Sequence, residues 1–343
     1  MRAVRYLILW PTAACDLDCG YCYRRQREPA TMTWPTAAAA LDLAAVSGAP
    51  FHVQLAGGEP TLVPDLVARV VTEVRRRRWP ATLAIQTNGL GLDPAMVRLL
   101  AEHQVQVGAS LDGPPPVHDR LRGRSADTFR GLGLLRDAGV PATITTVVTS
   151  VNAPHLGELV TILAGFSCVR GLGLDPLVRL GSAAGRADLA ASPAQLADGV
   201  RALYRRLGGL RALRGTPLVW RELAAVRRAA ALRPGPDAAI TDYCHACRGE
   251  SLAVAPDGTL YPCSQAVGDP GLVAGNIHDP AGIDWSVLDR AFAGRRLRGP
   301  CGRCPLRRRC PGDCPSRLAG ADADSDGAAM CLIYRTLAEL EGL

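Results

Sequence analysis

Three cysteines near the start of the chain could hold a reactive metal cluster. Cys15, Cys19 and Cys22 follow one another with the spacing C-x3-C-x2-C on one predicted loop. Three thiolates can ligate three irons of a [4Fe–4S] cube, which leaves the fourth iron open for chemistry. Zinc is the competing metal, but structural zinc takes four closed ligands, usually from paired C-x2-C arms, and fits this triplet poorly. The pattern therefore favours an iron–sulfur cluster with an open iron.

A second motif places this triplet in a recognisable order. Tyr21 precedes the last cysteine of the triplet, and after a second predicted strand come four consecutive residues, Gly57, Gly58, Glu59 and Pro60. Triplet, strand and Gly-Gly-Glu-Pro in this order resemble the radical S-adenosylmethionine (SAM) superfamily. The resemblance implies that the open iron chelates the amino and carboxylate groups of SAM. One electron from the cluster would then cleave SAM to a 5′-deoxyadenosyl radical, which takes a hydrogen from the substrate.

The resemblance also implies a set of SAM-binding residues. The stretch from Gly57 to Pro60 would bind the SAM amino group, although its composition alone fits a plain turn. Tyr21 matches the aromatic residue that sits against the adenine. Ser110 and Arg122 match the residues that hold the ribose and carboxylate in SPASM-type relatives, where Ser-Leu-Asp-Gly and His-Asp-x-x-Arg recur, although Arg122 could also be a solvated surface charge. Asn88, in the loop after a third predicted strand, completes the candidate set.

Alternating apolar strands and alanine- and leucine-rich helices predict the fold that positions these motifs. We expect strands at residues 6–10, 51–55, 82–86, 105–110, 142–148 and 168–174. We expect helices at residues 34–46, 64–77, 94–102, 127–137, 153–163 and 193–207. Six such units predict an α/β protein whose parallel sheet curls into a partial (β/α)6 barrel of the TIM type. The loops after its strands would build the active site at one rim.

The C-terminal third of the chain carries a second cysteine pattern. Its eight cysteines are Cys244, Cys247, Cys263, Cys301, Cys304, Cys310, Cys314 and Cys331, and four residues separate Gly258 from Cys263. This spacing resembles the SPASM domain with two auxiliary clusters. By that resemblance, the first [4Fe–4S] cluster is held by Cys244, Cys247, Cys263 and Cys314. The second is held by Cys301, Cys304, Cys310 and Cys331, which makes three clusters in the chain. Two zinc sites are the alternative, because C-x2-C arms also bind zinc.

The residues around Cys263 bear on the reaction. Residues 257–263 read as a tight β-hairpin in which Gly258 supplies the positive φ of the turn. In anaerobic sulfatase-maturating enzymes, which this chain resembles, a general-base aspartate directly follows the cysteine that matches Cys263. This chain has Ser264 at that position. Three other carboxylates, Asp112, Asp175 and Glu222, are candidate bases that the sequence does not rank.

Composition excludes several classes of protein. All 39 basic residues are arginine, so a Schiff-base lysine for pyridoxal phosphate and a P-loop lysine are both impossible. The net charge is +7, and the densest runs of arginine are residues 75–78 and 307–309. These runs lack interleaved aromatic residues, which disfavours a nucleic-acid partner. Twelve cysteines without an evident signal peptide predict a cytoplasmic protein whose thiols serve metals. No apolar run is long enough to span a membrane.

These patterns predict three parts and one function. We expect a radical SAM barrel at 1–210, a helical bridge at 211–241 that includes a helix at 217–232, and a SPASM domain with a small hairpin and short helices at 242–343. The resemblance implies a maturase that abstracts a side-chain hydrogen from a ribosomal precursor peptide and forms a carbon–carbon (cyclophane) or thioether cross-link by oxidation. Oxidation of a small molecule and formylglycine formation in sulfatases are the alternatives, and a non-enzymatic metal scaffold is the alternative of another class.

This interpretation predicts two kinds of protein partner. The arginine run at residues 307–309, between Cys304 and Cys310, could steer an acidic flavodoxin- or ferredoxin-like electron donor or an acidic peptide. No extra domain is expected before the first strand, so we expect recognition of a leader peptide by the barrel rim, the bridge or a separate protein.

Overall fold

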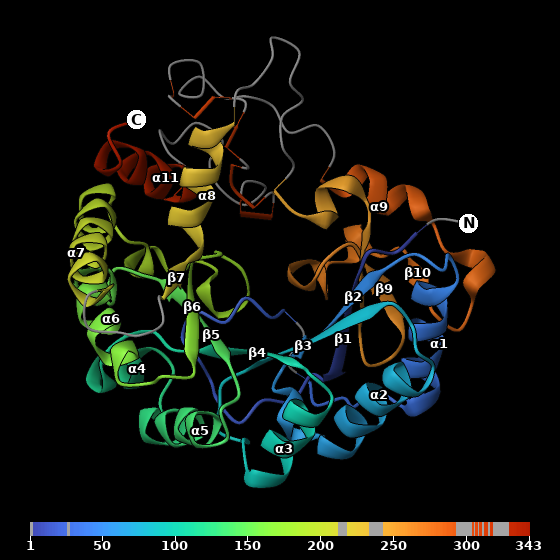
Figure 1. Cartoon of the computed structure of the whole chain (residues 1–343). Helices are drawn as coiled ribbons and strands as arrows, with labels where there is room; N and C mark the ends of the chain where they lie inside the picture. Colours follow the sequence, from blue (N-terminus) through green and yellow to red (C-terminus); the bar gives the residue numbers. More distant parts are fainter. Residues whose placement is uncertain are drawn as a thin grey trace.

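The fold is a curled, largely parallel sheet with helices on its outside. The computed structural model describes residues 3–25, 28–211, 218–232, 243–292, 304, 306–307, 309–310, 312–314, 316–317 and 329–343. In this part of the chain one sheet of ten strands runs in the order β10-β9-β8-β1-β2-β3-β4-β5-β6-β7. Figure 1 shows the strands at the centre and the helices in a ring around them.

The first six strands form the predicted partial barrel. They are β1 (Tyr6–Thr12), β2 (Phe51–Gly57), β3 (Ala81–Thr87), β4 (Gln106–Ser110), β5 (Ala142–Val148) and β6 (Val169–Pro176). Each pairs in parallel with the next. All six overlap the ranges that apolar, β-branched sequence predicts, so the α/β class and the partial barrel are confirmed.

The crossover helices lie where a parallel sheet requires them. They are α1 (Trp34–Ala45), α2 (Pro64–Arg76), α3 (Pro94–Glu102), α4 (Pro115–Leu121), α5 (Ser125–Asp137), α6 (Leu156–Ala164) and α7 (Pro193–Arg211). Helix α2 illustrates how they pack, because Val67, Val70, Val71 and Val74 form one buried stripe against the sheet. Asp93 caps α3 by accepting a hydrogen bond from the backbone N–H of Met96 at 2.7 Å.

Two helical segments of the barrel differ from the prediction. Helix α4 was not predicted, because its seven residues begin with two prolines that read as a loop; proline is tolerated in a first helical turn. The helix predicted at 153–163 is divided into a 3-10 turn at Ala153–His155 and helix α6, which begins at Leu156.

The bridge and the cysteine-rich segment extend both edges of the barrel sheet. The helix predicted at 217–232 is shorter, because Val219–Trp220 forms strand β7 beside β6 and α8 covers Arg221–Ala231. At the other edge, β8 (Ser251–Val254) pairs in parallel with β1. The predicted hairpin is confirmed, since β9 (Thr259–Tyr261) pairs antiparallel with β8 and Gly258 has a φ of +87°. Strand β10 (Gly275–Asn276) completes this edge.

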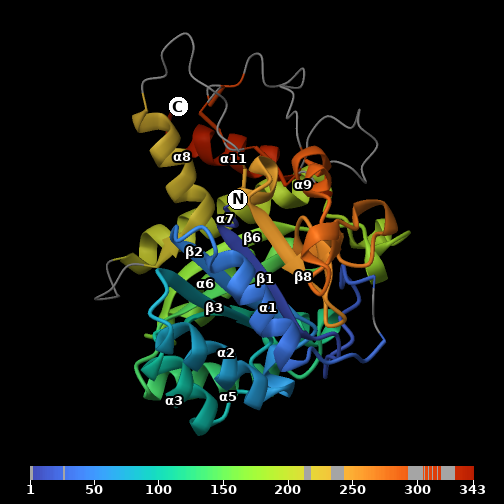
Figure 2. The same ribbon diagram turned by 90° about the vertical axis from the view of Figure 1, so that its right-hand side faces the viewer.

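The remaining helices lie around the open side of the barrel. These are α9 (Trp285–Ala291) and α11 (Ala329–Leu340). Figure 2 shows β8 beside β1, with α11 next to α7 and α8. None of the described helices combines the length and the apolar character that a membrane crossing requires.

Candidate active site

The loop after β1 carries the three cysteines of the N-terminal triplet. Cys19 is buried, and Cys15 and Cys22 are half-buried. Burial raises the pKa of the Cys19 thiol to about 11, and the nearby thiols of Cys22 and Cys15 add to the rise, while Arg122 opposes it. The three sulfurs are thus close enough to act on one another. A protonated thiol is costly to ionise here without a cation, and iron bound to all three would supply that charge.

Gly57, the last residue of β2, and Gly58 are in close contact with the start of this loop. A Cβ on Gly58 would lie 1.8 Å from the carbonyl oxygen of Ala14, and Gly57 has a φ of +114°. The backbone N–H of Gly58 donates to Thr12 at 2.9 Å, and that of Glu59 donates to Ala14 at 2.8 Å. Because the two glycines have no side chain, the backbone of the cysteine loop can pack directly against them.

The carboxylate of Glu59 organises the loop after β3. It is 2% exposed. One oxygen accepts hydrogen bonds from the backbone N–H of Thr61 and from the hydroxyls of Thr61 and Thr87, and the other accepts the backbone N–H of Asn88 at 2.7 Å. Burial raises the pKa of Glu59, and these hydrogen bonds oppose the rise. Glu59 thus fixes the position of the neighbouring loop.

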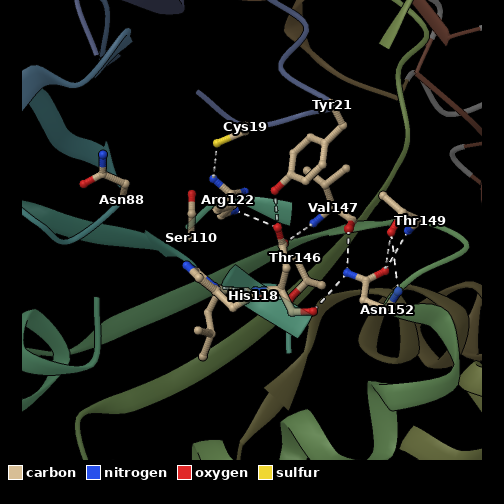
Figure 3. Close-up of polar contacts among 12 residues, drawn as sticks. Cys19, Tyr21, Asn88, Ser110, His118, Arg122, Thr146, Val147, Thr149 and Asn152 are labelled. Atoms are coloured by element: carbon tan, nitrogen blue, oxygen red, sulfur yellow. Dashed lines mark hydrogen bonds and ion pairs between the residues drawn. The ribbon is translucent and has the colours of Figure 1, made fainter. Parts of the chain in front are cut away.

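Asn88 connects that loop to the cysteine triplet. Its Nδ2 donates to the carboxylate of Asp16 at 2.6 Å, and its Oδ1 accepts the backbone N–H of Leu90. Ser110 ends β4 and accepts a hydrogen bond from the side chain of Gln86 at 3.2 Å. Asn88 and Ser110 therefore lie at the same rim as Cys19, as the barrel prediction requires, and Figure 3 shows all three in one view.

Asp112 is the centre of a group of polar contacts, and Figure 3 labels its partners Tyr21, Arg122 and Val147. Its carboxylate accepts a short hydrogen bond from the hydroxyl of Tyr21, a bond at 2.7 Å from Nε of Arg122, and a bond at 3.0 Å from the backbone N–H of Val147. The guanidinium of Arg122 also lies over the ring of Tyr21, at 5.2 Å from its centroid. Tyr21 and Arg122, two predicted SAM-binding residues, are thus held together by a carboxylate that the sequence offered only as an unranked candidate base.

His118 and Asn152 form hydrogen bonds with the backbone of Asp112, and neither was predicted as a site residue. The backbone N–H of Asp112 donates to Nδ1 of His118 at 3.3 Å, so the proton of the neutral ring is on Nε2, which lacks a partner in the described part of the chain. Asn152 donates to the backbone carbonyls of Asp112 and Val147. Only the fold brings these residues together, and no motif marks Asn152.

Two arginines approach the sulfurs of the triplet. Nε of Arg24 donates to the sulfur of Cys22 at 3.3 Å, and Nη1 of Arg122 lies 4.0 Å from the sulfur of Cys19. Arg24 is 7% exposed, so its charge acts on Cys22 with little screening by water. Guanidinium donors suit anionic thiolate ligands, and the loop therefore fits a cluster bound through three cysteines.

The cysteines assigned to the first auxiliary cluster also lie near one another. The sulfurs of Cys244 and Cys247 are 3.8 Å apart, and this contact raises the pKa of Cys244. Burial raises the pKa of Cys263 to about 12, with further contributions from Cys314 and Cys247. The fold thus gathers four thiols from three segments. Their number and softness fit a fully ligated iron–sulfur cluster.

The second auxiliary group is described only in part. Cys301 lies outside the described residues. Cys304 and Cys310 are half-buried and pack against the main core, and Cys331 lies on α11. Among the residues that the structure describes, no three histidine, cysteine or carboxylate side chains converge closely enough to hold a single metal ion.

Ser264 links the first strand to the cysteine-rich segment. Its hydroxyl accepts a hydrogen bond from the indole N–H of Trp10 at 2.9 Å and contacts the hydroxyl of Tyr23 at the same distance. Tyr23 directly follows Cys22, and Ser264 directly follows Cys263. The position that carries an aspartate in sulfatase-maturating relatives is here occupied by a hydroxyl between two aromatic side chains.

Comparison with known proteins identifies the family. The family model "Radical SAM superfamily" matches residues 11–161. The mycofactocin maturase MftC of Mycobacterium ulcerans is 30% identical over 317 residues, which cover 88% of this chain and 80% of that protein. The chain belongs to the radical SAM superfamily. It is therefore a SAM-dependent enzyme that generates a 5′-deoxyadenosyl radical, and its family implies a [4Fe–4S] cluster.

Two further relatives extend the comparison of this radical SAM enzyme. A serine-type anaerobic sulfatase-maturating enzyme of Klebsiella aerogenes is 27% identical over 336 residues, which cover 90% of this chain and 78% of that protein. The uncharacterized protein MJ0907 of Methanocaldococcus jannaschii is 32% identical over 182 residues. That match covers 51% of this chain and 63% of the archaeal protein, which is less than two thirds of its length.

Solved structures share the fold. Native anSMEcpe with bound AdoMet and Kp18Cys peptide has a TM-score of 0.77 at 22% identity and covers 97% of this chain and 96% of its own. Streptococcus suis SuiB bound to precursor peptide SuiA has a TM-score of 0.69 at 17% identity and covers 96% of this chain and 76% of its own. Both likenesses extend through the barrel and the cysteine-rich segment.

Proposed function

We propose that this radical SAM enzyme is a peptide maturase. It would abstract hydrogen from a side-chain carbon of a ribosomally made precursor peptide and close a carbon–carbon or thioether cross-link by oxidation. The likeness to the mycofactocin maturase, over 88% of the chain, carries the proposal. A relative named PqqA peptide cyclase, 30% identical over 74% of the chain, supports a peptide as substrate.

The residues of the β1 to β4 loops would hold the cofactors. Cys15, Cys19 and Cys22 would bind the cluster, and the bound cluster with SAM supplies the 5′-deoxyadenosyl radical. Around it, the further SAM-contacting residues would be Tyr21, Gly57, Gly58, Glu59, Pro60, Asn88, Ser110 and Arg122. The carboxylate of Asp112 would orient Arg122 and Tyr21 toward this ligand, because it contacts both.

We also infer two auxiliary [4Fe–4S] clusters, three clusters in all. Cys244, Cys247, Cys263 and Cys314 would hold the first, and their gathering in the fold supports this. Cys301, Cys304, Cys310 and Cys331 would hold the second. Full ligation would leave these clusters to carry electrons rather than to bind substrate.

The domain boundaries and the protein partners follow from the same hypothesis. The barrel would cover residues 1–210, the bridge 211–241 and the SPASM domain 242–343. An acidic flavodoxin- or ferredoxin-like protein would supply electrons, and a separate protein could present the leader of the precursor peptide. The cytoplasm would provide both partners in a reducing environment.

Formylglycine formation is the second candidate, because sulfatase-maturating enzymes match over 90% of the chain. Ser264 weighs against it. The hydroxyl of Ser264 is hydrogen-bonded to Trp10 and Tyr23, and a serine hydroxyl cannot replace a carboxylate as a base near neutral pH. Oxidation of a small molecule is the third candidate from the sequence.

One experiment separates these candidates. The reduced, reconstituted enzyme is incubated anaerobically with SAM and, in turn, the short peptide encoded beside its gene, a sulfatase-derived Cys or Ser peptide, and a panel of small alcohols. The 5′-deoxyadenosine yield and the product mass are measured for each. We expect stimulated 5′-deoxyadenosine formation and an oxidised product only with the precursor peptide. An aldehyde on the sulfatase peptide, or turnover of an alcohol alone, would contradict the proposal.

A further inference from the structure

Three carboxylates that the sequence leaves unranked as bases differ in the structure. Asp112 is 1% exposed, and both of its oxygens accept hydrogen bonds. Glu222 is also 1% exposed; its oxygens accept the backbone N–H of Leu174 at 3.1 Å and Nε of Arg221 at 2.6 Å. Neither carboxylate is placed to meet a substrate.

Asp175 differs from both because it lies at the rim and is accessible. Its side chain is 36% exposed, and its Oδ1 accepts a hydrogen bond from Nη2 of Arg221 at 2.8 Å. It is the penultimate residue of β6, so it lies at the same edge of the sheet as the cysteine loop after β1. Parallel strands place the residues at their carboxyl ends around one mouth.

The side chain of Asp175 faces the inside of the barrel. Leu172 and Leu174 alternate with it along β6 and are buried in the main core under the helices. Successive side chains of a strand point to opposite faces, so Gly173 and Asp175 point inward. A Cβ on Gly173 would lie 2.8 Å from the guanidinium carbon of Arg221. The missing side chain of Gly173 therefore leaves the space in which the guanidinium of Arg221 lies beside the strand and reaches Asp175.

A polar path continues from this pair to the cysteine-rich segment. The charges of Asp175 and Arg317 both act on the side chain of Tyr243, so Asp175 lies within electrostatic range of Tyr243. Nη2 of Arg317 donates to the hydroxyl of Tyr243 at 3.1 Å, and its Nε donates to Asp313 at 2.6 Å. The same carboxylate accepts the backbone N–H of Cys314. Asp175 thus lies between the barrel mouth and the first auxiliary group of cysteines.

We propose that Asp175 is the proton acceptor of the oxidative cross-linking step, with Arg221 as the positioning residue that holds its carboxylate toward the barrel interior. The inference rests on the proposed function. It assigns the base of that reaction to the accessible, inward-facing carboxylate of β6 rather than to Asp112 or Glu222.

Atoms and electrons are conserved in this oxidation of the peptide. The bound cluster and SAM would supply the 5′-deoxyadenosyl radical, and loss of one hydrogen atom to it from a C–H bond of the peptide would leave a carbon radical. When this carbon bonds to a second peptide atom that carries a hydrogen, one proton and one electron must leave. The carboxylate of Asp175 would accept the proton, and the electron would go to an oxidised iron–sulfur cluster, the class of acceptor that the auxiliary cysteines would hold. The peptide loses two hydrogens in total, and Asp175 returns its proton to water.

The test measures coupling rather than activity alone. Wild-type, Asp175→Asn and Asp175→Glu enzymes are reconstituted, checked for iron content, and incubated with SAM, dithionite and the precursor peptide. The ratio of cross-linked peptide to 5′-deoxyadenosine is measured. Asparagine keeps an oxygen for Arg221 but cannot accept the proton, so we expect 5′-deoxyadenosine formation to persist while the ratio falls roughly 100-fold. Glutamate should restore a substantial part of the ratio.

Asp137→Asn is the matched control. Asp137 also accepts a guanidinium N–H, from Arg136 at 2.9 Å, but it ends α5 at the opposite edge of the sheet. This variant should keep the wild-type ratio. An unchanged ratio in Asp175→Asn would overturn the inference, as would a loss of iron and 5′-deoxyadenosine that glutamate does not restore. A wild-type enzyme that forms 5′-deoxyadenosine but never converts the peptide would instead reject the proposed function, and the role of Asp175 with it.

Discussion

At the scale of single residues, the site depends on buried charges that hold one another in place. The carboxylate of Asp112 contacts Tyr21, Arg122 and Val147, and Arg122 is itself only 10% exposed. Removing one partner of such a pair leaves an uncompensated charge in a poorly solvated place. Asp112 should therefore matter for stability as well as for the orientation of Arg122.

We predict that Asp112→Asn lowers the free energy of unfolding by about 3 kcal/mol, because Arg122 loses the carboxylate with which it forms an ion pair at 2.7 Å. Thermal unfolding of the iron-free protein would measure the loss. Asp127→Asn is the control, since Asp127 pairs with the exposed Arg124 at 2.9 Å, and such a surface pair contributes less than about 1 kcal/mol. Equal losses in the two variants would contradict this account of Asp112.

His118 should give the stability a specific pH dependence. Burial lowers the pKa of His118 from 6.5 to about 4 in the folded protein. The unfolded chain binds a proton below pH 6.5, whereas the folded chain does so only near pH 4, so the free energy of unfolding falls as the pH falls through this window. The loss should be on the order of 2–3 kcal/mol.

His118→Gln should lose this part of the pH dependence, because glutamine does not titrate. The comparison requires unfolding curves of the iron-free protein and variant between pH 4 and pH 6.5. If both lose stability in parallel over that range, the ionisation of His118 does not contribute.

Residues with a local spacing were predictable, and residues joined only by the fold were not. Cys15, Cys19 and Cys22 form a motif within one loop, so the sequence identifies them directly. Asn152 meets Asp112 through the packing of the loop after β5, forty residues further along the chain. Arg24 was missed because a charged residue two positions after a cysteine carries no pattern of its own. Its contact with the sulfur of Cys22 becomes evident only in three dimensions.

At the scale of elements, the end of β2 shapes the cysteine loop. Sequence reasoning assigned Gly57 and Gly58 to close approach of a ligand, whereas within the chain the close approach is that of residues 12–14. The two roles are compatible, because a loop packed this tightly is also held in one position for its ligand. The packing role makes a prediction that is independent of SAM.

Gly58→Ala should prevent normal assembly of the cluster, because its Cβ would lie 1.8 Å from the carbonyl oxygen of Ala14. We expect a several-fold lower iron content after reconstitution, measured by iron analysis and visible absorption. Gly20→Ala lies inside the same loop, and a Cβ there would meet nothing within 4 Å, so it should retain the wild-type iron content. A Gly58→Ala enzyme that binds iron like the Gly20→Ala control would disprove the packing role.

The order of elements was predictable because each strand and helix has its own periodicity. Exceptions arose where local preference and tertiary context differ. Helix α4 begins with prolines that locally favour a loop, and strand β7 has only two residues, too few for a periodic pattern. Their positions are set by packing against α5 and pairing with β6.

At the scale of the whole molecule, the cysteine-rich segment is joined to the barrel by its sheet. Strand β8 lies beside β1 in parallel, with Ser251 opposite Tyr6 and Val254 opposite Leu9. This pairing joins residues about 245 positions apart, which no local pattern can indicate. The predicted domain boundary near residue 242 is therefore crossed by hydrogen bonds of one continuous sheet.

A core substitution in β8 should accordingly destabilise the barrel as well. Leu252 is completely buried in the core that also contains Leu7 and Leu9. We predict that Leu252→Ala lowers the free energy of unfolding by about 2–5 kcal/mol and shifts a single cooperative transition. Val219→Ala, in the exposed edge strand β7, should cost less than about 1 kcal/mol. Separate transitions for the two parts in Leu252→Ala would contradict a shared core.

Oxidative cross-linking of a peptide would be evident in the mass of the precursor peptide encoded beside this gene after anaerobic incubation with reconstituted enzyme, SAM and dithionite. We predict loss of two hydrogens from the peptide together with formation of 5′-deoxyadenosine, and fragmentation would then locate the new bond. A peptide of unchanged mass beside accumulated 5′-deoxyadenosine would contradict oxidative cross-linking of that peptide. Deuterium uptake from solvent in that case would favour inversion at an α-carbon instead.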